Sequence, residues 1–383
     1  MKYLIAFVCL VAGLACGCSS GGQRADLSDF TVSIYQPAYA SGFEILGSEE
    51  SASSLVRITR PWQGEALESF DLLILREGEA APSDFAGAVI EGEALRIVAL
   101  SSSNVAMFDR LGEAQRIVGV SGIDYITSAN ITKRAAEGEL HDVGYDTALN
   151  YELLTILKPD IVLLYSVSGA NSGVTAKLTE LNIPYIYIGD YAEESPLGKA
   201  EWMVAMGEIC GKRTVAEQLF AQSEASYNDL KQKALECSER PAVMLNAPYR
   251  DIWYMPSERS YMVRLIEDAG AQYAYKGNST ASTKPISVEE AYALATTSQF
   301  WLNTGVSINS MADLRSQVPK FAQMPMVRNS AVYNSTARST PMGGSDFWES
   351  GVVYPERILA DLIEIFHPSL IEGEGLYYYK QLE

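Results

Sequence analysis

The strongest constraint on the fold is a regular alternation of short apolar segments with amphipathic segments, which begins near Arg96. Each apolar segment is long enough for one buried strand, and each amphipathic segment ends at a Gly, Pro or Asn that stops a helix. Successive strand–helix units of this length are typical of a parallel sheet that helices cover on both faces. Strands are predicted at 96–100, 116–120, 160–166 and 184–189, and helices at 102–112, 149–159 and 174–182.

The same alternation returns in the second half of the chain. Strands are predicted at 241–247, 252–256, 299–303 and 331–334, and helices at 260–270, 287–295, 311–318 and 354–368. Between the halves, residues 197–237 contain no Pro and place apolar side chains three and four positions apart. This pattern predicts one long helix, or a helix pair that Gly211 breaks or kinks. We therefore predict an α/β fold of two Rossmann-like lobes, 96–195 and 238–383, joined by a rigid helical connector at 196–237.

The first residues have the composition of an export signal. One Lys precedes an apolar stretch that is too short to span a membrane permanently, and small residues follow around two cysteines. A cysteine in this place resembles the lipobox of bacterial lipoproteins. We expect residues 1–18 to be a lipoprotein signal with Cys18 acylated, and Cys16 is the alternative. An ordinary signal peptide also remains open, and residues 19–29 are expected to form a polar tether.

Residues 30–95 differ from the two lobes. Their apolar and polar residues alternate, and Gly, Ser and Pro separate the alternating stretches, which predicts a β-rich extension of antiparallel strands packed on the first lobe. Beyond the signal only Cys210 and Cys237 remain. A straight helix would hold them roughly 40 Å apart, so we predict no disulfide between them.

The composition disfavours several functions. The formal charge of −19 is opposite to what nucleic acid requires. No strand is followed by a Gly-rich phosphate loop. The two histidines, His141 and His367, cannot build a three-ligand zinc site, and no Ser lies in a nucleophile elbow. His367 stands at a predicted helix end, where capping is its ordinary role. We predict that the protein is not an enzyme and holds no resident cofactor or metal.

Aromatic side chains and arginines gather after the predicted strands and in the loops. Ligands of open α/β sheets bind outside the carboxyl ends of the strands, and aromatics with a few charged donors suit a bulky ligand. Any one of these residues could instead be an ordinary surface or core residue. The candidates are Tyr125, Tyr145, Tyr165, Tyr191, Tyr249, Arg250, Trp253, Tyr254, Arg338, Phe347 and Trp348.

Several segments carry a resemblance to a known family. They are 96–120, 150–166 with its E-x-x-x-x-L-K-P-D-I-V pattern, 196–212, 286–295 and the GGSDFWESG loop at 343–351. From about Arg96 to Pro368 the chain resembles the substrate-binding proteins of bacterial ABC importers for ferric siderophores, haem and cobalamin (class III, with a helical backbone). The resemblance implies that the ligand lies in a cleft between the lobes and that the connector permits only modest closure.

The resemblance also implies a role for two glutamates. In this family a glutamate on each lobe docks into arginine pockets of the permease. Glu152 matches the first by its place before L-L-x-x-L-K-P-D, and Glu289 matches the second in I-S-V-E-E, with Glu290 as the neighbouring alternative. Two carboxylates on matched helices can also steer a partner that carries two cationic pockets. A favourable interaction with the helix dipole is the alternative for each.

We therefore expect a monomeric, lipid-anchored protein of the bacterial cell envelope that faces the periplasm and serves an ABC permease dimer with its ATPase. A ferric siderophore is the first choice of ligand, cobalamin the second and haem the third. Arg250, Lys284 and Arg338 would suit an anionic chelate, whereas Trp253, Tyr254 and Trp348 would suit cobalamin. The rival hypotheses are an envelope interaction lipoprotein that uses 30–90 for contact, and a hydrolase or reductase that uses His141.

Overall fold

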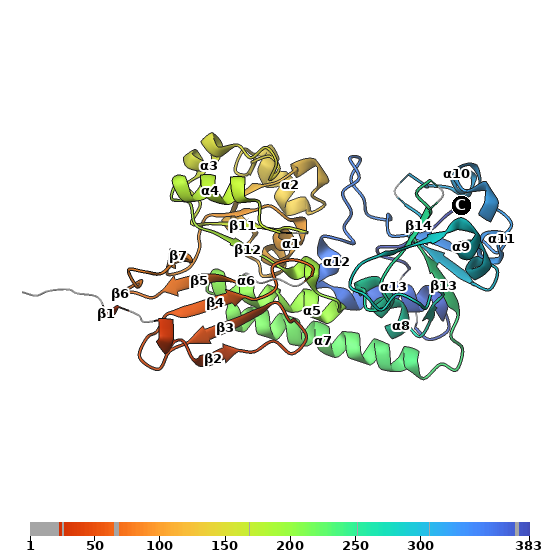
Figure 1. Cartoon of the computed structure of the whole chain (residues 1–383), viewed down its shortest axis with the longest axis horizontal. Coiled ribbons are helices and arrows are strands. Elements are labelled where there is room, and N and C mark those ends of the chain that lie inside the picture. The colour runs from red at the N-terminus through yellow and green to blue at the C-terminus, as the bar shows by residue number, and fades with distance from the viewer. Residues whose placement is uncertain are drawn as a thin grey trace, which may run out of the picture.

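Two α/β lobes lie side by side, a small sheet extends from the first lobe, and one long helix runs along the base of both (Figure 1). This computed structural model describes residues 23–24, 27–64, 69–167, 169–250, 252–305, 307–371 and 375–383. The predicted signal, with Cys16 and Cys18, lies outside the described residues. In the part of the chain that is described, no helix is both long and apolar enough to cross a membrane.

The first lobe is built on a five-stranded parallel sheet in the order β10-β9-β8-β11-β12. Its strands are β8 (Ile97–Ala99), β9 (Ile117–Val120), β10 (His141–Asp142), β11 (Ile161–Leu164) and β12 (Tyr185–Tyr187). Its helices are α1 (Ser102–Arg110), α2 (Ala129–Ala136), α3 (Tyr151–Leu157) and α4 (Ser172–Glu180). Short 3-10 turns lie at Ala114–Arg116, Ile123–Tyr125 and Asp190–Ala192. All predicted elements of this lobe are confirmed, while α2 and β10 were not predicted.

The second lobe repeats the plan with one reversed edge strand, in the order β15-β13-β17-β18-β19. Its strands are β13 (Ala242–Leu245), β15 (Gln272–Tyr273), β17 (Phe300–Leu302), β18 (Val332–Asn334) and β19 (Lys380–Gln381). An antiparallel ribbon of β14 (Ile252–Met255) and β16 (Lys284–Ser287) stands apart from this sheet. The helices are α8 (Tyr261–Asp268), α9 (Val288–Ala295), α10 (Met311–Gln317), α11 (Pro325–Arg328), α12 (Ser350–Val353) and α13 (Pro355–Phe366), with a 3-10 turn at Pro319–Phe321.

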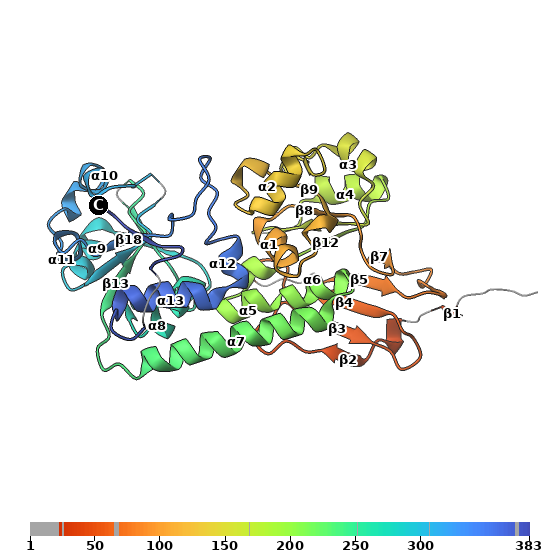
Figure 2. The ribbon, with the colours of Figure 1, turned by 180° about the vertical axis from the view of Figure 1, so that it is seen from behind.

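The connector consists of three helices, α5 (Pro196–Glu201), α6 (Met203–Ile209) and α7 (Arg213–Leu235). Gly211 adopts φ of +70°, a left-handed conformation that ends α6 and lets the chain reverse into α7. The prediction of a break at Gly211 is confirmed, and only α7 spans both lobes (Figure 2). At about 1.5 Å per residue its 23 residues extend about 35 Å. Cys210 and Cys237 are both free, as predicted.

The extension is a five-stranded sheet in the order β2-β3-β4-β5-β7, so its predicted β-rich character is confirmed. Its strands are β2 (Val32–Tyr35), β3 (Phe43–Gly47), β4 (Ser54–Ile58), β5 (Phe70–Leu75) and β7 (Ala88–Glu91). The prediction of purely antiparallel pairing is wrong, because β5 and β7 run parallel. The tether is not wholly irregular either: β1 (Gln23–Arg24) pairs with β6 (Glu79–Ala80), and a 3-10 turn follows at Leu27–Asp29.

Buried carboxylates join the extension to the connector. Glu201 is completely buried in α5 and accepts hydrogen bonds from the backbone N–H groups of residues 38–40, at 2.6 to 2.8 Å, and from the Tyr35 hydroxyl at 2.8 Å. Glu193 accepts the backbone N–H groups of Ser41 and Gly42, both at 2.9 Å. Buried charges persist only when they are well bonded. The extension is therefore an integral part of the first lobe.

Candidate functional site

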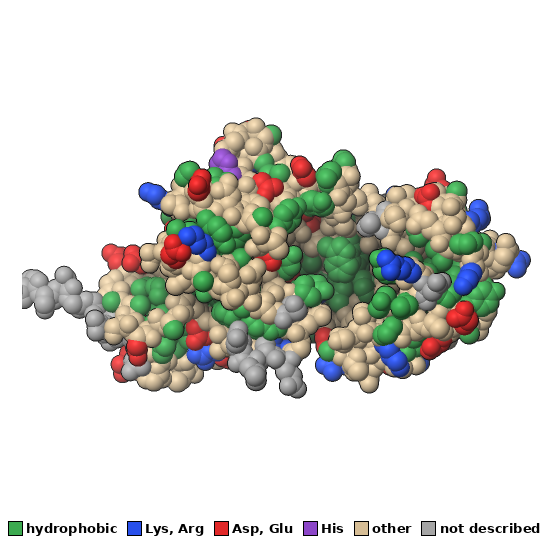
Figure 3. Space-filling view, turned by 45° about the horizontal axis from the view of Figure 1, so that its top comes forward, with side chains coloured by type: hydrophobic (Ala, Val, Ile, Leu, Met, Phe, Trp, Pro, Cys, Tyr) green, Lys and Arg blue, Asp and Glu red, His purple; other side chains and the backbone are tan. Residues whose placement is uncertain are grey.

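A cleft separates the two lobes, and Figure 3 shows it as a hollow with hydrophobic side chains on its floor. It consists of two adjoining hollows of about 200 and 300 Å³. Both are lined by Tyr191, Lys199 and Trp348, so they form one continuous site. The loops that follow the carboxyl ends of the first lobe's strands supply much of its wall, as an open α/β sheet favours.

The structure brings together five of the eleven candidate ligand residues in the larger hollow. Tyr125 follows β9, Tyr165 follows β11 and Tyr191 follows β12, while Tyr145 lies in the loop after β10. Trp348 comes from the second lobe. The five side chains are each between 42% and 50% exposed. They present flat apolar faces with hydroxyl groups at their edges, which is suited to a large, partly polar ligand.

Two predicted aromatic contacts are wrong, because their side chains are in the core. Trp253 is completely buried, where its indole N–H donates to the Leu245 carbonyl at 2.8 Å. Phe347 is also buried, with its ring 4.7 Å from that of Trp348 in an edge-on contact. Phe347 therefore supports the exposed Trp348 from below instead of facing the cleft itself. Both neighbours were named as ligand candidates, and only Trp348 is exposed to the cleft.

The predicted arginines do not line the cleft hollows. Arg338 lies in a different groove between the lobes, where its Nε is 2.6 Å from Asp346. Tyr249 and Arg250 form the turn between β13 and β14, with the guanidinium of Arg250 5.3 Å from the Tyr249 ring centroid. Neither residue belongs to either hollow. On the ribbon that follows, Tyr254 is partly exposed and Lys284 donates to the Gly277 carbonyl at 3.0 Å.

The cations of the cleft are residues that the sequence did not single out. Lys199 of α5 is buried beneath Tyr191, and its ammonium group donates to the carbonyls of Asp190 at 2.8 Å and Tyr191 at 3.3 Å. It lies 5.3 Å from the ring centroid of Tyr261. Burial lowers the pKa of Lys199, and burial raises the pKa of the Asp190 carboxyl beside it. Nothing in the sequence around Lys199 indicates that it would be buried.

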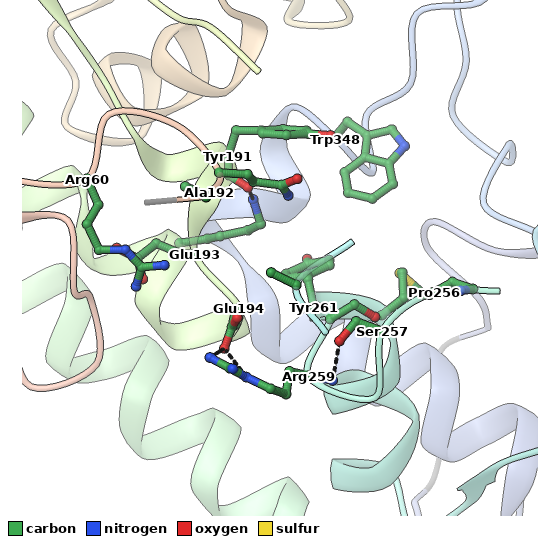
Figure 4. A pocket seen from close by; sticks show the side chains of 16 residues that line it. Arg60, Tyr191, Ala192, Glu193, Glu194, Pro256, Ser257, Arg259, Tyr261 and Trp348 are labelled. Carbon is green, nitrogen blue, oxygen red and sulfur yellow. Dashed lines mark hydrogen bonds and ion pairs between the residues drawn. The ribbon is translucent and has the colours of Figure 1, made fainter. Parts of the chain in front are cut away.

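The extension and the second lobe form the mouth of the smaller hollow. Arg60, in the loop after β4, lines it and donates to the Ser41 hydroxyl at 2.7 Å. Across the mouth, Arg259 of the second lobe pairs with Glu194 of the first at 2.9 Å (Figure 4). The extension thus contributes a cationic side chain to the cleft, which its strand pattern alone did not predict.

A hairpin of the second lobe, residues 335–349, is clamped onto the first lobe. The carboxylate of Glu349 accepts the backbone N–H groups of Thr127 at 2.7 Å and Ser128 at 2.8 Å, at the start of α2. Burial raises the pKa of Glu349 to about 7. A Cβ at Gly344 would lie 1.9 Å from the Tyr125 carbonyl oxygen, so only glycine permits this approach. The hairpin also fixes the position of Trp348.

The described residues of the cleft have the features of a binding site. Within the described ranges, no group of three or more His, Cys, Asp or Glu side chains is placed to hold a metal ion. His141 is exposed at the sheet edge in β10. The ring of His367, which follows α13, contacts the Gly270 carbonyl after α8 at 3.0 Å instead of capping its own helix.

Comparison with known proteins decides the family. The sequence profile of the family described as "Periplasmic binding protein" matches residues 97–338, more than half of the chain. This chain belongs to the periplasmic binding protein family. The match covers the first lobe, the connector and the second lobe as far as Arg338, and the extension lies outside it. Because members of the family are solute-binding proteins, the prediction that the chain is not an enzyme is confirmed.

Relatives of this periplasmic binding protein are distant. An uncharacterised lipoprotein of Methanocaldococcus jannaschii is 24% identical over 301 residues, which cover 76% of this chain and 69% of the relative. An uncharacterised ABC transporter substrate-binding lipoprotein of Bacillus subtilis is 28% identical over 189 residues, which cover 48% of this chain and 57% of that relative.

Solved structures confirm the two-lobed fold with a helical backbone. A periplasmic haem-binding protein of Pseudomonas aeruginosa superimposes with a TM-score of 0.58 at 20% identity, over 76% of this chain and 98% of that protein. A possible iron-binding solute-binding protein of Staphylococcus epidermidis gives a TM-score of 0.57 at 18% identity, over 72% of this chain and 99% of that protein.

Proposed function

We propose that this periplasmic binding protein captures an iron chelate, a ferric siderophore in the first place, and delivers it to an ABC importer. The observation that carries the proposal is the cleft with four tyrosines, Trp348 and the cations Lys199 and Arg60. Aromatic faces suit the body of a chelate, and cations suit its anionic groups. The haem- and iron-binding names of the two structural neighbours are consistent with this class of ligand.

A siderophore is preferred to haem because of how the iron would be held. Haem iron needs an axial ligand from the protein, and a tyrosine serves best as the phenolate. A siderophore supplies all of its own iron ligands, so the protein needs only to contact the outside of the chelate. Cobalamin is the alternative ligand, because it too needs no metal ligand from the cleft.

The protein would act at the cell envelope and be held there by a lipid on Cys18. Glu152 and Glu289 would dock it onto the permease. Each is exposed in the first turn of its helix, α3 in one lobe and α9 in the other. Neither carboxylate forms an ion pair with a described side chain, so both are free to meet cationic pockets of a partner.

Trp348 is suited to a fluorescence test of ligand binding, because it is the exposed tryptophan of the cleft. The chain has five tryptophans, and the other four, Trp62, Trp202, Trp253 and Trp301, are buried. The mature protein is titrated with ferric siderophores, cyanocobalamin and haem while tryptophan emission is recorded and corrected for ligand absorbance. A ferric siderophore should quench saturably, and the variants Trp348→Ala and Lys199→Met should weaken its affinity. Tyr249→Ala, outside the cleft, is the matched control and should bind normally.

Each outcome has a definite meaning. Saturation by cobalamin or haem alone would keep the importer function and replace the cargo. No saturation by any of the three classes would refute the iron-chelate proposal. For docking, Glu152→Lys with Glu289→Lys should abolish ligand-stimulated ATPase of the reconstituted importer and leave ligand affinity unchanged. The control Glu180→Lys, which alters an exposed carboxylate on α4, should preserve stimulation.

A further inference from the structure

A second groove between the lobes, of about 390 Å³, has a different chemistry from the cleft. It shares no lining residue with the two cleft hollows. Three arginines line it, Arg110 at the end of α1, Arg338 of the hairpin and Arg357 of α13. Arg110 belongs to the first lobe and the other two to the second. We refer to it below as the arginine groove.

The arginines alternate with two tyrosine rings. The guanidinium carbons of Arg110 and Arg357 lie 4.2 and 4.1 Å from the centroid of the same ring, Tyr354. Arg357 is also 5.3 Å, and Arg338 4.5 Å, from the ring centroid of Tyr377. Stacking on aromatic faces holds guanidinium groups in place and leaves their N–H edges available for planar, bidentate contacts. The three cations are therefore held in a fixed arrangement.

Two of these arginines have unused hydrogen-bonding capacity. Arg110 donates through Nη2 to the Leu219 carbonyl and the Ser223 hydroxyl, but its Nε and Nη1 are buried and have no hydrogen-bond partner. Arg357 forms no ion pair with any described side chain. A buried donor without a partner is costly, and two cations that share one ring repel each other. An anion that met both would relieve both costs.

The carboxylates of the arginine groove are already engaged. Asp109 accepts from the Ser128 hydroxyl at 2.8 Å and from the Asn130 amide at 3.2 Å. Asp346 pairs with Arg338, and Glu349 accepts backbone N–H groups of the first lobe. None of them is within ion-pair distance of Arg110 or Arg357. Glu356, the neighbour of Arg357 on α13, contributes the largest opposing charge at Arg110, but it forms no ion pair with a described side chain.

We propose that the arginine groove is a second binding site, specific for a small anion with two or more carboxylate or phosphate groups. One anionic group would accept from Arg357, with Arg338 at the edge, and another would accept from Arg110 after its guanidinium turns its buried Nε and Nη1 toward the groove. Because the arginines come from both lobes, the bound anion would hold the lobes together. The site is independent of the ligand in the cleft.

The test uses citrate and pyrophosphate as probes in calorimetric titrations of the mature protein at low ionic strength. Both should bind saturably at millimolar concentration or below, and acetate should bind far more weakly because it has one anionic group. Arg357→Glu should weaken binding of both probes by about tenfold or more, the effect of one lost charge-assisted contact. Arg338→Ala should weaken it less, because that arginine retains Asp346 as a partner.

Two variants separate the site from general charge and from the cleft. Arg315→Glu alters an exposed arginine of α10 by the same charge and should bind as the wild type does. Trp348→Ala removes a cleft side chain and should also bind normally. The absence of saturable binding, equal affinity in Arg357→Glu, or loss of binding in Trp348→Ala would each overturn the proposal. Chemical unfolding of every variant verifies that it is folded.

Discussion

The raised pKa of Glu349 makes the contact between the lobes dependent on pH. The carboxyl is 2% exposed, and its pKa rises from 4.5 to about 7 because burial penalises its charged form. Between these values the folded protein binds a proton that the unfolded chain releases. The stabilising contribution is therefore complete below pH 4.5 and is lost as the pH rises through about 7.

The size of the effect follows from the shift. One pKa unit corresponds to about 1.4 kcal/mol, so the shift of Glu349 is equivalent to about 3 kcal/mol. Glu349→Gln cannot ionise and removes this dependence. Relative to wild type, the free energy of unfolding of Glu349→Gln should therefore increase by about 3 kcal/mol from below pH 4.5 to above pH 7.

Urea unfolding of the two proteins across this range, followed by circular dichroism, measures the difference directly. Glu180→Gln removes one exposed carboxylate and controls for the change in net charge. A difference between wild type and Glu349→Gln that stays constant with pH would refute the reasoning, because it would mean that Glu349 has the same pKa in the folded and unfolded chains. The protection of residues 127–128 from hydrogen exchange, corrected for the intrinsic rise of exchange with pH, should decrease above pH 7 in the wild type only, since charging Glu349 weakens the clamp.

Three further predictions concern residues outside the ligand contacts. Glu201→Gln loses the acceptor for two of four buried donors and should lower the free energy of unfolding by about 3 to 5 kcal/mol in urea titrations; a loss below about 1 kcal/mol would contradict this. Gly344→Ala places a methyl group against Tyr125 and should lower the melting temperature and the ligand affinity together, so normal values for both would show that the hairpin can shift. Cys210 is buried with its pKa raised to about 12, so mass spectrometry should find it unmodified by iodoacetamide in the native protein, whereas partly exposed Cys237 is alkylated.

The sequence pattern was sufficient to predict an element where many of its residues are apolar and lie on a buried face. The amphipathic helix α13 and the apolar strands β8 and β11 were predicted because most of their side chains are buried in a regular period. The helix α2 was missed because Ile131 is its only buried residue, so a single large apolar side chain marks it in the sequence. β10 is two residues long and exposed, and owes its existence to pairing with β9.

Some residues of the candidate site could be predicted from the sequence, and others could not. Tyr165, Tyr191, Tyr249 and Arg338 were predicted to follow strands directly, and the parallel sheet of the first lobe brings only Tyr165 and Tyr191 to the cleft. In β14, by contrast, alternate residues face opposite sides, so Trp253 is buried while its neighbour Tyr254 is exposed. All four residues of β14 are apolar or aromatic, so the sequence does not say which side faces the core.

By itself, therefore, the sequence determined the α/β class, the two lobes with their helical connector, the β-rich extension and a set of aromatic residues suited to binding. Tertiary structure alone decided which aromatics face the cleft, that Lys199 lies buried beneath it, and that Arg110, Arg338 and Arg357 meet in a separate groove. The physical reason is the distance along the chain over which each kind of interaction acts. Periodicity and capping act between residues a few positions apart, whereas burial and charge pairing depend on segments that packing brings together from both lobes.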